Sequence, residues 1–144
     1  MDLGHEERDY AAGHSDRAPR LDEGQWGRMM EHIRGICRKA GEYGVRPVIH
    51  PHAGGYIEFA DEIEALVRDI SYELAGLCLD TGEGAMCPIG RGCLDYPGIK
   101  KTLEEIRYSG YITVEQERDP RNSDTSLRDV KESVAYLKRV GYQI

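Results

Sequence analysis

Three short apolar runs, each ending in a residue that can bind a metal ion or move a proton, constrain the fold most. The runs cover residues 46–49, 74–79 and 111–114, and the residues that end them are His50, Asp80 and Glu115. His50 and Asp80 are 30 residues apart, and Asp80 and Glu115 are 35 apart, which is typical of one strand–helix unit each. The pattern predicts short strands connected through helices.

Stretches with helical periodicity alternate with these runs. Apolar residues recur at three- and four-residue steps from Trp26 to Ala40, after an expected N-cap at Asp22, and again over 59–70, 97–106 and 127–140. This alternation predicts an α/β architecture with a parallel sheet. Residues 1–22 mix charged residues with glycine and show no period, so we expect a mobile N-terminal arm before one domain over 23–144.

The strand ends predict a metal site. Parallel strands bring their carboxyl ends to one rim, where barrels of this class build their active sites. His50, Asp80 and Glu115 would meet there, with His52 beside them. Mixed nitrogen and oxygen ligands suit Mn²⁺, Co²⁺, Zn²⁺ or Fe²⁺. Taken singly, each residue has a plainer interpretation, since a strand-end aspartate is more often a helix cap and a lone histidine more often a core or surface residue.

Two residues outside the strand ends are candidate substrate contacts. Arg91 lies in a glycine-rich loop and would bind a phosphate or hydroxy-acid group, although a surface arginine is the commoner interpretation. Gln116 follows the third run, where the alternative is an ordinary polar loop. The glycines over 82–92 do not form a dinucleotide-binding fingerprint.

Composition excludes several classes of function. Nineteen basic residues against 26 acidic ones give a formal charge of −7, which argues against a general polyanion binder. No apolar run approaches the ~20 residues that span a bilayer, and the charged first twenty residues do not form a signal peptide. We therefore expect a cytoplasmic protein with neither a nucleic-acid nor a membrane partner. The four cysteines have no CxxC spacing and are expected to be free thiols, the alternative being a disulfide or zinc site at Cys87 and Cys93.

Several segments resemble the sugar phosphate isomerase/epimerase superfamily, the xylose isomerase-like TIM barrels, and most closely its inosose dehydratase branch. Val48–Gly54 is similar to the branch's apolar-His-Pro-His-x-Gly segment, and Leu77–Gly82 to its strand ending in Asp-Thr-Gly-His. Gly92–Ile99 resembles the Gly-x-hydrophobic-Asp segment before the last helix pair. Tyr108–Gln116 looks like the terminal Val-Glu strand, and Ser133–Gly141 like the C-terminal helix.

The resemblance implies a divalent metal ion (Mn²⁺, Co²⁺, Mg²⁺ or Zn²⁺) at the mouth of a (β/α)₈ barrel, and chemistry next to the carbonyl of a sugar or polyol ketone. By matched position, Asp80 and Glu115 would be metal ligands, and His50 falls near the place where many relatives carry a glutamate ligand. His52 would be a ligand or a substrate contact. Glu83 or His52 would be the catalytic base.

The sequence also departs from the family pattern. Glu83 stands where the motif has histidine, and the next strand, with its His-x-His-x-Lys-Asp segment, has no counterpart. A barrel of this class takes ~250 residues, against 144 here. We therefore expect the C-terminal half of a barrel that lacks one βα unit. Its function would be that of a metal-dependent isomerase, epimerase or dehydratase completed by a second copy or a partner chain, or of a non-catalytic remnant that at most binds metal or a polyol. A DNA-repair endonuclease is a distant third.

Overall fold

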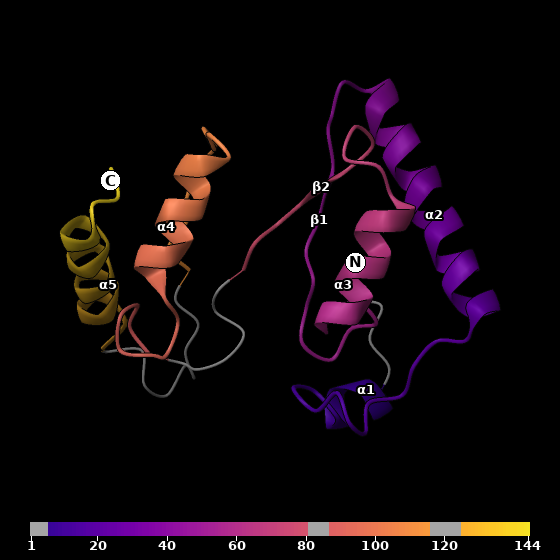
Figure 1. The fold of residues 1–144 in the computed structure, drawn as a ribbon, viewed down its shortest axis with the longest axis horizontal. Coiled ribbons are helices and arrows are strands. Elements are labelled where there is room, and N and C mark those ends of the chain that lie inside the picture. Colours follow the sequence, from indigo (N-terminus) through magenta and orange to yellow (C-terminus); the bar gives the residue numbers. More distant parts are fainter. Residues whose placement is uncertain (1–5, 81–86, 116–124) are drawn as a thin grey trace. The chain divides into compact units, whose positions relative to one another are not determined.

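The computed structural model describes residues 6–80, 87–115 and 125–144, which divide into two compact units, 1–83 and 84–144. The first unit contains α1 (Glu6–Tyr10), α2 (Glu23–Glu42), β1 (Val48–Ile49), α3 (Ala60–Asp69) and β2 (Gly76–Leu77). The second contains α4 (Tyr96–Glu105) and α5 (Ser126–Val140). Figure 1 follows this order along the chain. No helix among the described residues is both long and apolar enough to cross a membrane.

Helix α2, which the apolar periodicity from Trp26 to Ala40 predicts, begins at the expected position. Asp22 accepts a hydrogen bond from the backbone N–H of Gln25 at 2.7 Å, and the Gln25 side chain accepts one from the backbone N–H of Asp22 at 2.9 Å. This reciprocal capping box satisfies two backbone donors that the first turn leaves without helical acceptors. The predicted N-cap at Asp22 is thus confirmed.

The predicted parallel direction of the first two strands is confirmed. Val48 pairs with Gly76 and Ile49 with Leu77, in a parallel two-stranded sheet. The connection between the two strands runs through α3, which makes a β–α–β unit. Parallel pairing places the residues that follow β1 and β2 at the same edge of the sheet. His50 follows β1 directly, and Asp80 lies three residues beyond β2.

The core of the first unit lies between the strand pair and two helices. Figure 1 shows α2 and α3 on the same side of the strands, and the buried cluster joins Met30 and Cys37 of α2 to Leu66 of α3. Ile49 packs against this cluster, whereas Val48, its neighbour in the strand, is exposed on the other face. The alternation of side chains along a strand accounts for this difference.

A polar contact also joins the two helices. The indole N–H of Trp26 on α2 donates a hydrogen bond to Oδ2 of Asp69 at the end of α3, at 2.7 Å. This hydrogen bond is the main reason why the pKa of Asp69 is lowered. Partial burial raises the pKa, whereas the positive charges of Arg68 and Arg34 lower it further.

Trp26→Phe is therefore expected to lower the free energy of unfolding by about 1.5 kcal/mol, because it removes a hydrogen bond to a charged acceptor. The loss should be full above the unfolded-state Asp pKa of about 3.9 and should shrink as the pH falls through the lower folded-state pKa. Urea unfolding of the variant and the wild type across this pH range measures it. A difference that does not depend on pH would assign the stabilisation by Trp26 to packing alone.

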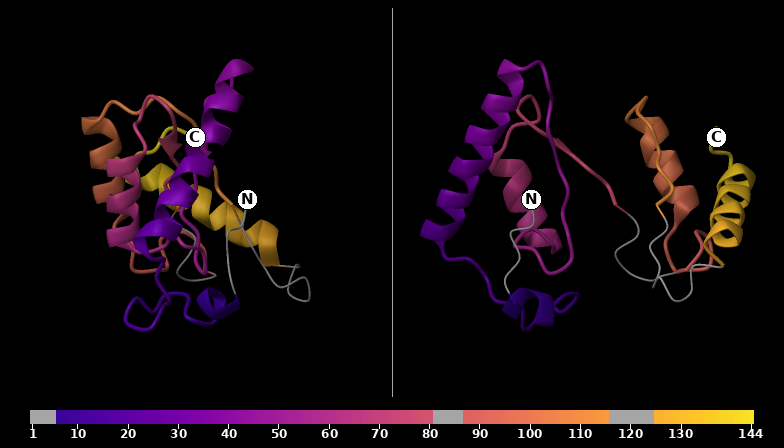
Figure 2. Two further views of the ribbon diagram at one scale, coloured as in Figure 1. Left: turned by 90° about the vertical axis from the view of Figure 1, so that its right-hand side faces the viewer. Right: turned by 180° about the vertical axis from the view of Figure 1, so that it is seen from behind.

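The second unit is built on the contact between α4 and α5 (Figure 2). Asp95 caps α4 by accepting a hydrogen bond from the backbone N–H of Gly98 at 3.0 Å. Tyr142, just beyond α5, donates to the backbone carbonyl of Tyr96 at 3.0 Å. Gly141 ends α5 with a φ of +97°, a conformation that favours glycine.

The predicted third strand is wrong. Residues 111–115 belong to no strand, and the Tyr111 side chain is 98% exposed. A β-strand exists only where a neighbouring strand satisfies its backbone groups, and the described residues of the second unit contain no strand for it to pair with. β-Branched composition alone does not supply that neighbour.

The cysteines are free thiols, as predicted. Cys37 is buried, and this burial raises the pKa of its thiol. Cys93 is exposed, while Cys78 and Cys87 are half-buried. Cys78, although it lies in the apolar run 74–79, is therefore not part of the buried core.

Candidate functional site

His50 and Asp80 lie together at the carboxyl edge of the strand pair. The distance between His50 Nε2 and Asp80 Oδ2 is 3.1 Å. The two side chains are 40% and 28% exposed, so the pair faces solvent. Two of the three residues predicted to share a metal ion are thus brought into contact by parallel pairing of β1 and β2.

His52 lies next to this pair. Its ring is 5.6 Å from that of His50, centroid to centroid, in an edge-on arrangement. Its Nδ1 lies 2.8 Å from the backbone oxygen of Ala53. A carbonyl oxygen can only accept, so this contact requires the proton on Nδ1 and makes Nε2 the basic nitrogen of the neutral ring.

The donors are of types that bind a divalent metal ion, and their separation suits either two ligands of one ion or a direct ion pair between the two side chains. Two ligand atoms that each lie about 2.1 Å from one ion are about 3.0 Å apart when the angle between them is 90°, and about 3.4 Å apart when the angle is tetrahedral. His50 Nε2 and Asp80 Oδ2 are 3.1 Å apart. The described ranges contain no cluster of three or more His, Cys, Asp or Glu side chains placed to hold an ion. A metal site at this pair therefore stays a prediction.

The other predicted site residues fall elsewhere. Glu83 and Gln116 lie outside the described residues. Glu115 belongs to the second unit, so its convergence with His50 and Asp80 stays a prediction. Arg91, also in the second unit, directs its guanidinium to Glu132, with contacts of 2.6 and 3.0 Å. That ion pair gives Arg91 a partner within the second unit, and its contact with a substrate group stays a prediction.

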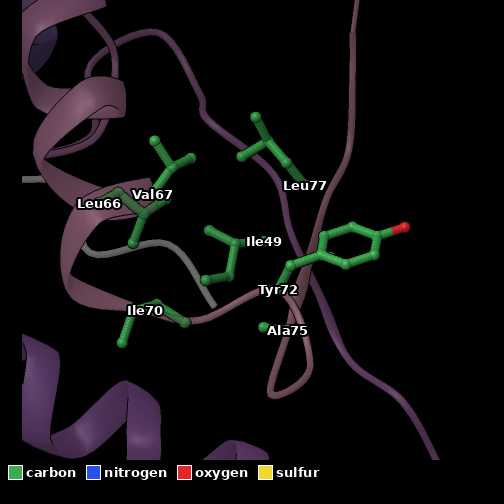
Figure 3. A pocket seen from close by; sticks show the side chains of 8 residues that line it. Ile49, Leu66, Val67, Ile70, Tyr72, Ala75 and Leu77 are labelled. Carbon is green, nitrogen blue, oxygen red and sulfur yellow. The ribbon is translucent and has the colours of Figure 1, made fainter. Parts of the chain in front are cut away.

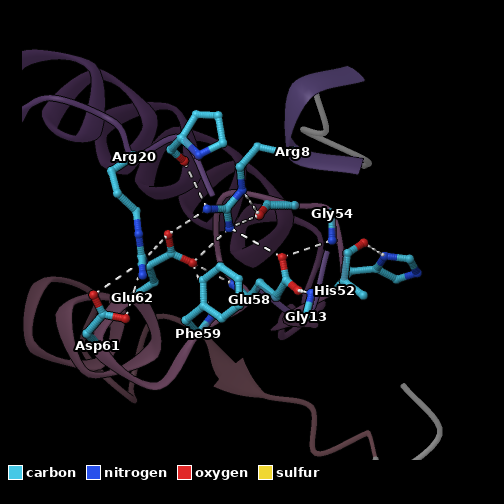
Figure 4. A network of polar contacts seen from close by, with 12 residues as sticks. Arg8, Gly13, Arg20, His52, Gly54, Glu58, Phe59, Asp61 and Glu62 are labelled. Atoms are coloured by element: carbon cyan, nitrogen blue, oxygen red, sulfur yellow. Dashed lines mark hydrogen bonds and ion pairs between the residues drawn. The ribbon is translucent and has the colours of Figure 1, made fainter. Parts of the chain in front are cut away.

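The loop that carries His52 is held by a polar network around Arg8 (Figure 4). Arg8 is fully buried, and its Nε donates to the backbone carbonyl of Gly55 at 2.8 Å. Its Nη1 and Nη2 contact the two carboxylate oxygens of Glu62 at 3.1 and 3.0 Å. Glu58 accepts from the backbone N–H of Gly54 at 3.0 Å. The guanidinium carbon also lies within about 5 Å of the ring centroids of Tyr56 and Phe59, as in cation–π contacts.

The Glu62 carboxylate is the main counter-charge in this network. Burial by itself would raise its pKa, but backbone hydrogen bonds from Glu58 and Phe59, together with the Arg8 guanidinium, outweigh burial and lower the pKa. Glu62 is therefore ionised at neutral pH and balances the buried cation.

The sequence argument missed Arg8 and its acidic partners. Residues 1–22 were expected to be a mobile arm, but the described part of this segment contains α1 and contributes Arg8 to the first unit. Glu58 and Glu62 flank Phe59 at the start of α3 with a spacing of four residues. Two carboxylates this close together, one of them buried, require a cation nearby. The spacing of Glu58 and Glu62 was the available sequence signal for such a cation.

Two cavities of the first unit lie apart from the histidines. One of about 90 Å³ is apolar and lies between α3 and β2 (Figure 3). Its lining includes Ile49, Leu66 and Leu77. The other, of about 280 Å³, lies near the start of α2 and includes Trp26 and Arg20 in its lining. Neither cavity is lined by His50, His52 or Asp80.

Comparison with known proteins defines the class. The model of the xylose isomerase-like TIM barrel family matches residues 8–86, which is more than half of the chain and includes Arg8, His50 and Asp80. The chain therefore belongs to this family.

The curated relatives point to one branch of it. An inosose dehydratase from Bacillus licheniformis is 23% identical over 150 residues, covering 71% of this chain and 50% of the relative. An inosose dehydratase from Geobacillus kaustophilus is 25% identical over 149 residues (70% and 48%). The rhizopine catabolism protein MocC from Rhizobium meliloti is 21% identical over 155 residues (74% and 47%). The chain thus spans about half the length of the curated relatives it matches, and no solved structure matches it.

Proposed function

We propose that this chain provides a divalent-metal site for chemistry next to the carbonyl of a sugar or polyol ketone, of the inosose type. The observation that carries the proposal is the 3.1 Å approach of His50 Nε2 to Asp80 Oδ2 at the carboxyl edge of two parallel strands. Family membership and the names of the curated relatives support the substrate class.

Each side chain has a role in this proposal. His50 and Asp80 hold the ion, and Glu115, which belongs to the second unit, stays the predicted third ligand. A bound divalent ion of the Mn²⁺, Co²⁺, Mg²⁺ or Zn²⁺ type would polarise the substrate carbonyl. His52 removes the proton on the adjacent carbon through Nε2, because its Nδ1–H is directed to Ala53. Glu83 is the alternative base, and Gln116 and Arg91 are candidate substrate contacts.

A second copy of the chain, or a partner chain, would complete the site. Val48 and Leu79 are more than half exposed around the strand pair, and a two-stranded parallel sheet leaves open edges that proteins normally cover. We propose that added strands cover this face. The cytosol suits the four free thiols and is the compartment we propose.

A second candidate is a chain that binds metal or a polyol without turnover. It is favoured by one observation: the described residues bring together two ligands, whereas catalytic zinc sites use three protein ligands.

Metal titration followed by an NMR assay of inosose consumption distinguishes the two candidates. We expect the full chain to bind about one Mn²⁺ or Co²⁺ per site, with light scattering giving the mass of the species that binds. Loss of the substrate signal with the metal-loaded protein supports an enzyme, and binding without loss supports the second candidate. Absence of binding to the monomer and to any oligomer contradicts both metal proposals.

A further inference from the structure

Arg8, in the segment before α2, contacts the loop that carries His52. Arg8 of α1 is 47 residues from Gly55 in sequence, yet both its Nε and its Nη2 donate to the Gly55 carbonyl oxygen. Its Nη1 also donates to the backbone oxygen of Pro19 at 3.0 Å. One guanidinium thus joins the N-terminal segment, the loop and the start of α3.

The bond to Gly55 bears directly on His52. The backbone N–H of Gly55 donates to the carbonyl of His52 at 2.9 Å, and the backbone N–H of His52 donates to the carbonyl of Ile57 at 3.1 Å. Residues 52–57 therefore form a closed turn, and the Gly55 carbonyl is the group in it that Arg8 holds. Fixing that carbonyl restrains the backbone of the turn, and this backbone sets the direction in which the side chain of His52 leaves the chain.

Glu58 holds the same turn from the other side. One of its oxygens accepts from Gly54 N–H at 3.0 Å, and the other accepts from Gly13 N–H at 2.6 Å. Gly54 has a φ of +79°, and a Cβ built there would lie 3.3 Å from the Cα of Asp9. The backbone of the N-terminal segment and that of the turn are thus in close contact.

We propose that Arg8 is a positioning residue for the His50–His52 site: its fork of donors sets the conformation of the 52–57 turn and thereby the direction of the His52 imidazole, whose edge-on contact with the ring of His50 orients that proposed ligand toward a bound metal ion. The inference rests on the proposed metal site. It assigns a function to residues 6–20 that the sequence pattern did not suggest. Ordering of surrounding groups is a known way in which residues that do not touch the metal tune its affinity.

Arg8→Lys tests the inference while keeping the charge opposite Glu62. An ammonium group cannot donate in the fixed fork that reaches Gly55 and Glu62 together. We expect Co²⁺ affinity to fall about 10- to 100-fold, with a changed visible absorption spectrum of bound Co²⁺. Amide exchange at Gly54, Gly55 and His52 should become about 10-fold faster in the metal-free chain, because the hydrogen-bonded turn opens more often.

Arg20→Met is the matched control. Arg20 also contacts Glu62 and stacks over Phe59, but no hydrogen bond or ion pair joins it to residues 52–57. We expect its Co²⁺ spectrum to match that of the wild type. A loss of affinity equal to that of Arg8→Lys would assign the effect to the stability of the network and overturn the positioning role.

The remaining outcomes separate this inference from the proposed function. If the wild type binds Co²⁺ and Arg8→Lys binds it equally well, the inference fails and the metal site stands. If the wild type binds no Co²⁺, the proposed metal site fails, and the inference fails with it. If Arg8→Lys does not fold, Glu58→Gln decides, because it weakens the turn at Gly54 and Gly13: an unchanged Co²⁺ affinity in that folded variant overturns the inference.

Discussion

Asp80→Ala is expected to reduce divalent-metal affinity at least about 100-fold. Substitution of residues that only support metal ligands commonly lowers metal affinity about 10- to 100-fold. Asp80 is itself a proposed ligand, and its Oδ2 lies 3.1 Å from Nε2 of the other proposed ligand, His50. Its side chain is 28% exposed, so the contact with His50 contributes at most about 1 kcal/mol to folding. Isothermal titration with Mn²⁺, together with thermal unfolding of the same samples, separates the two effects.

Matched controls make this result specific. Asp16 is an exposed aspartate of the same unit, and His32 is an exposed histidine on α2. Asp16→Ala and His32→Ala should bind Mn²⁺ like the wild type, whereas Asp80→Ala and His50→Ala should both lose affinity. Equal binding by all four variants would show that the ion, if bound, is held elsewhere.

Glu62→Ala is expected to destabilise the first unit by about 3 kcal/mol or more, because it leaves the guanidinium of Arg8 buried without its main counter-charge. Arg8 is fully buried, and the Glu62 side chain is 9% exposed. Urea unfolding measures the loss as a lower midpoint. Glu64→Ala is the control, since Glu64 lies exposed on the same helix and should change stability by less than about 0.5 kcal/mol.

The same carboxylate predicts the direction of the pH dependence. The pKa of Glu62 is lowered in the folded chain, so the unfolded state takes up its proton first as the pH falls. The stabilisation by Glu62 is present above the unfolded-state value of about 4.3 and is lost as the pH falls through the folded-state pKa. The difference between Glu62→Ala and the wild type should therefore shrink in acid, and a constant difference would contradict this account.

The sequence was sufficient to predict features that repeat or stay local. The spacing from His50 to Asp80 predicted neighbouring parallel strands, and β1 and β2 pair in that way. The cap at Asp22 involves residues three apart, so its signal was complete in the sequence. The contact between His50 and Asp80 followed from the strand prediction, because parallel neighbours share a carboxyl edge.

Features that depend on distant residues were not predictable in this way. Residues 111–114 have a strand-like composition, but a strand also needs a neighbour, and composition does not report one. Arg8 lies in a short charged stretch without periodicity, and its role depends on a backbone carbonyl, which carries no sequence signal. The ion pair of Arg91 with Glu132 joins residues 41 apart, so local sequence did not predict it, and the substrate contact of Arg91 stays a prediction.

The dependence of the histidine turn on Arg8 has a consequence for protein engineering. The His50-Pro51-His52 motif is short and lies between a strand and a turn, so it invites transfer to another protein. A graft of residues 48–58 into another protein would nevertheless leave behind the guanidinium that is bonded to Gly55. The recipient would need an equivalent cation beneath the turn, and a designer should transplant the two segments as one unit.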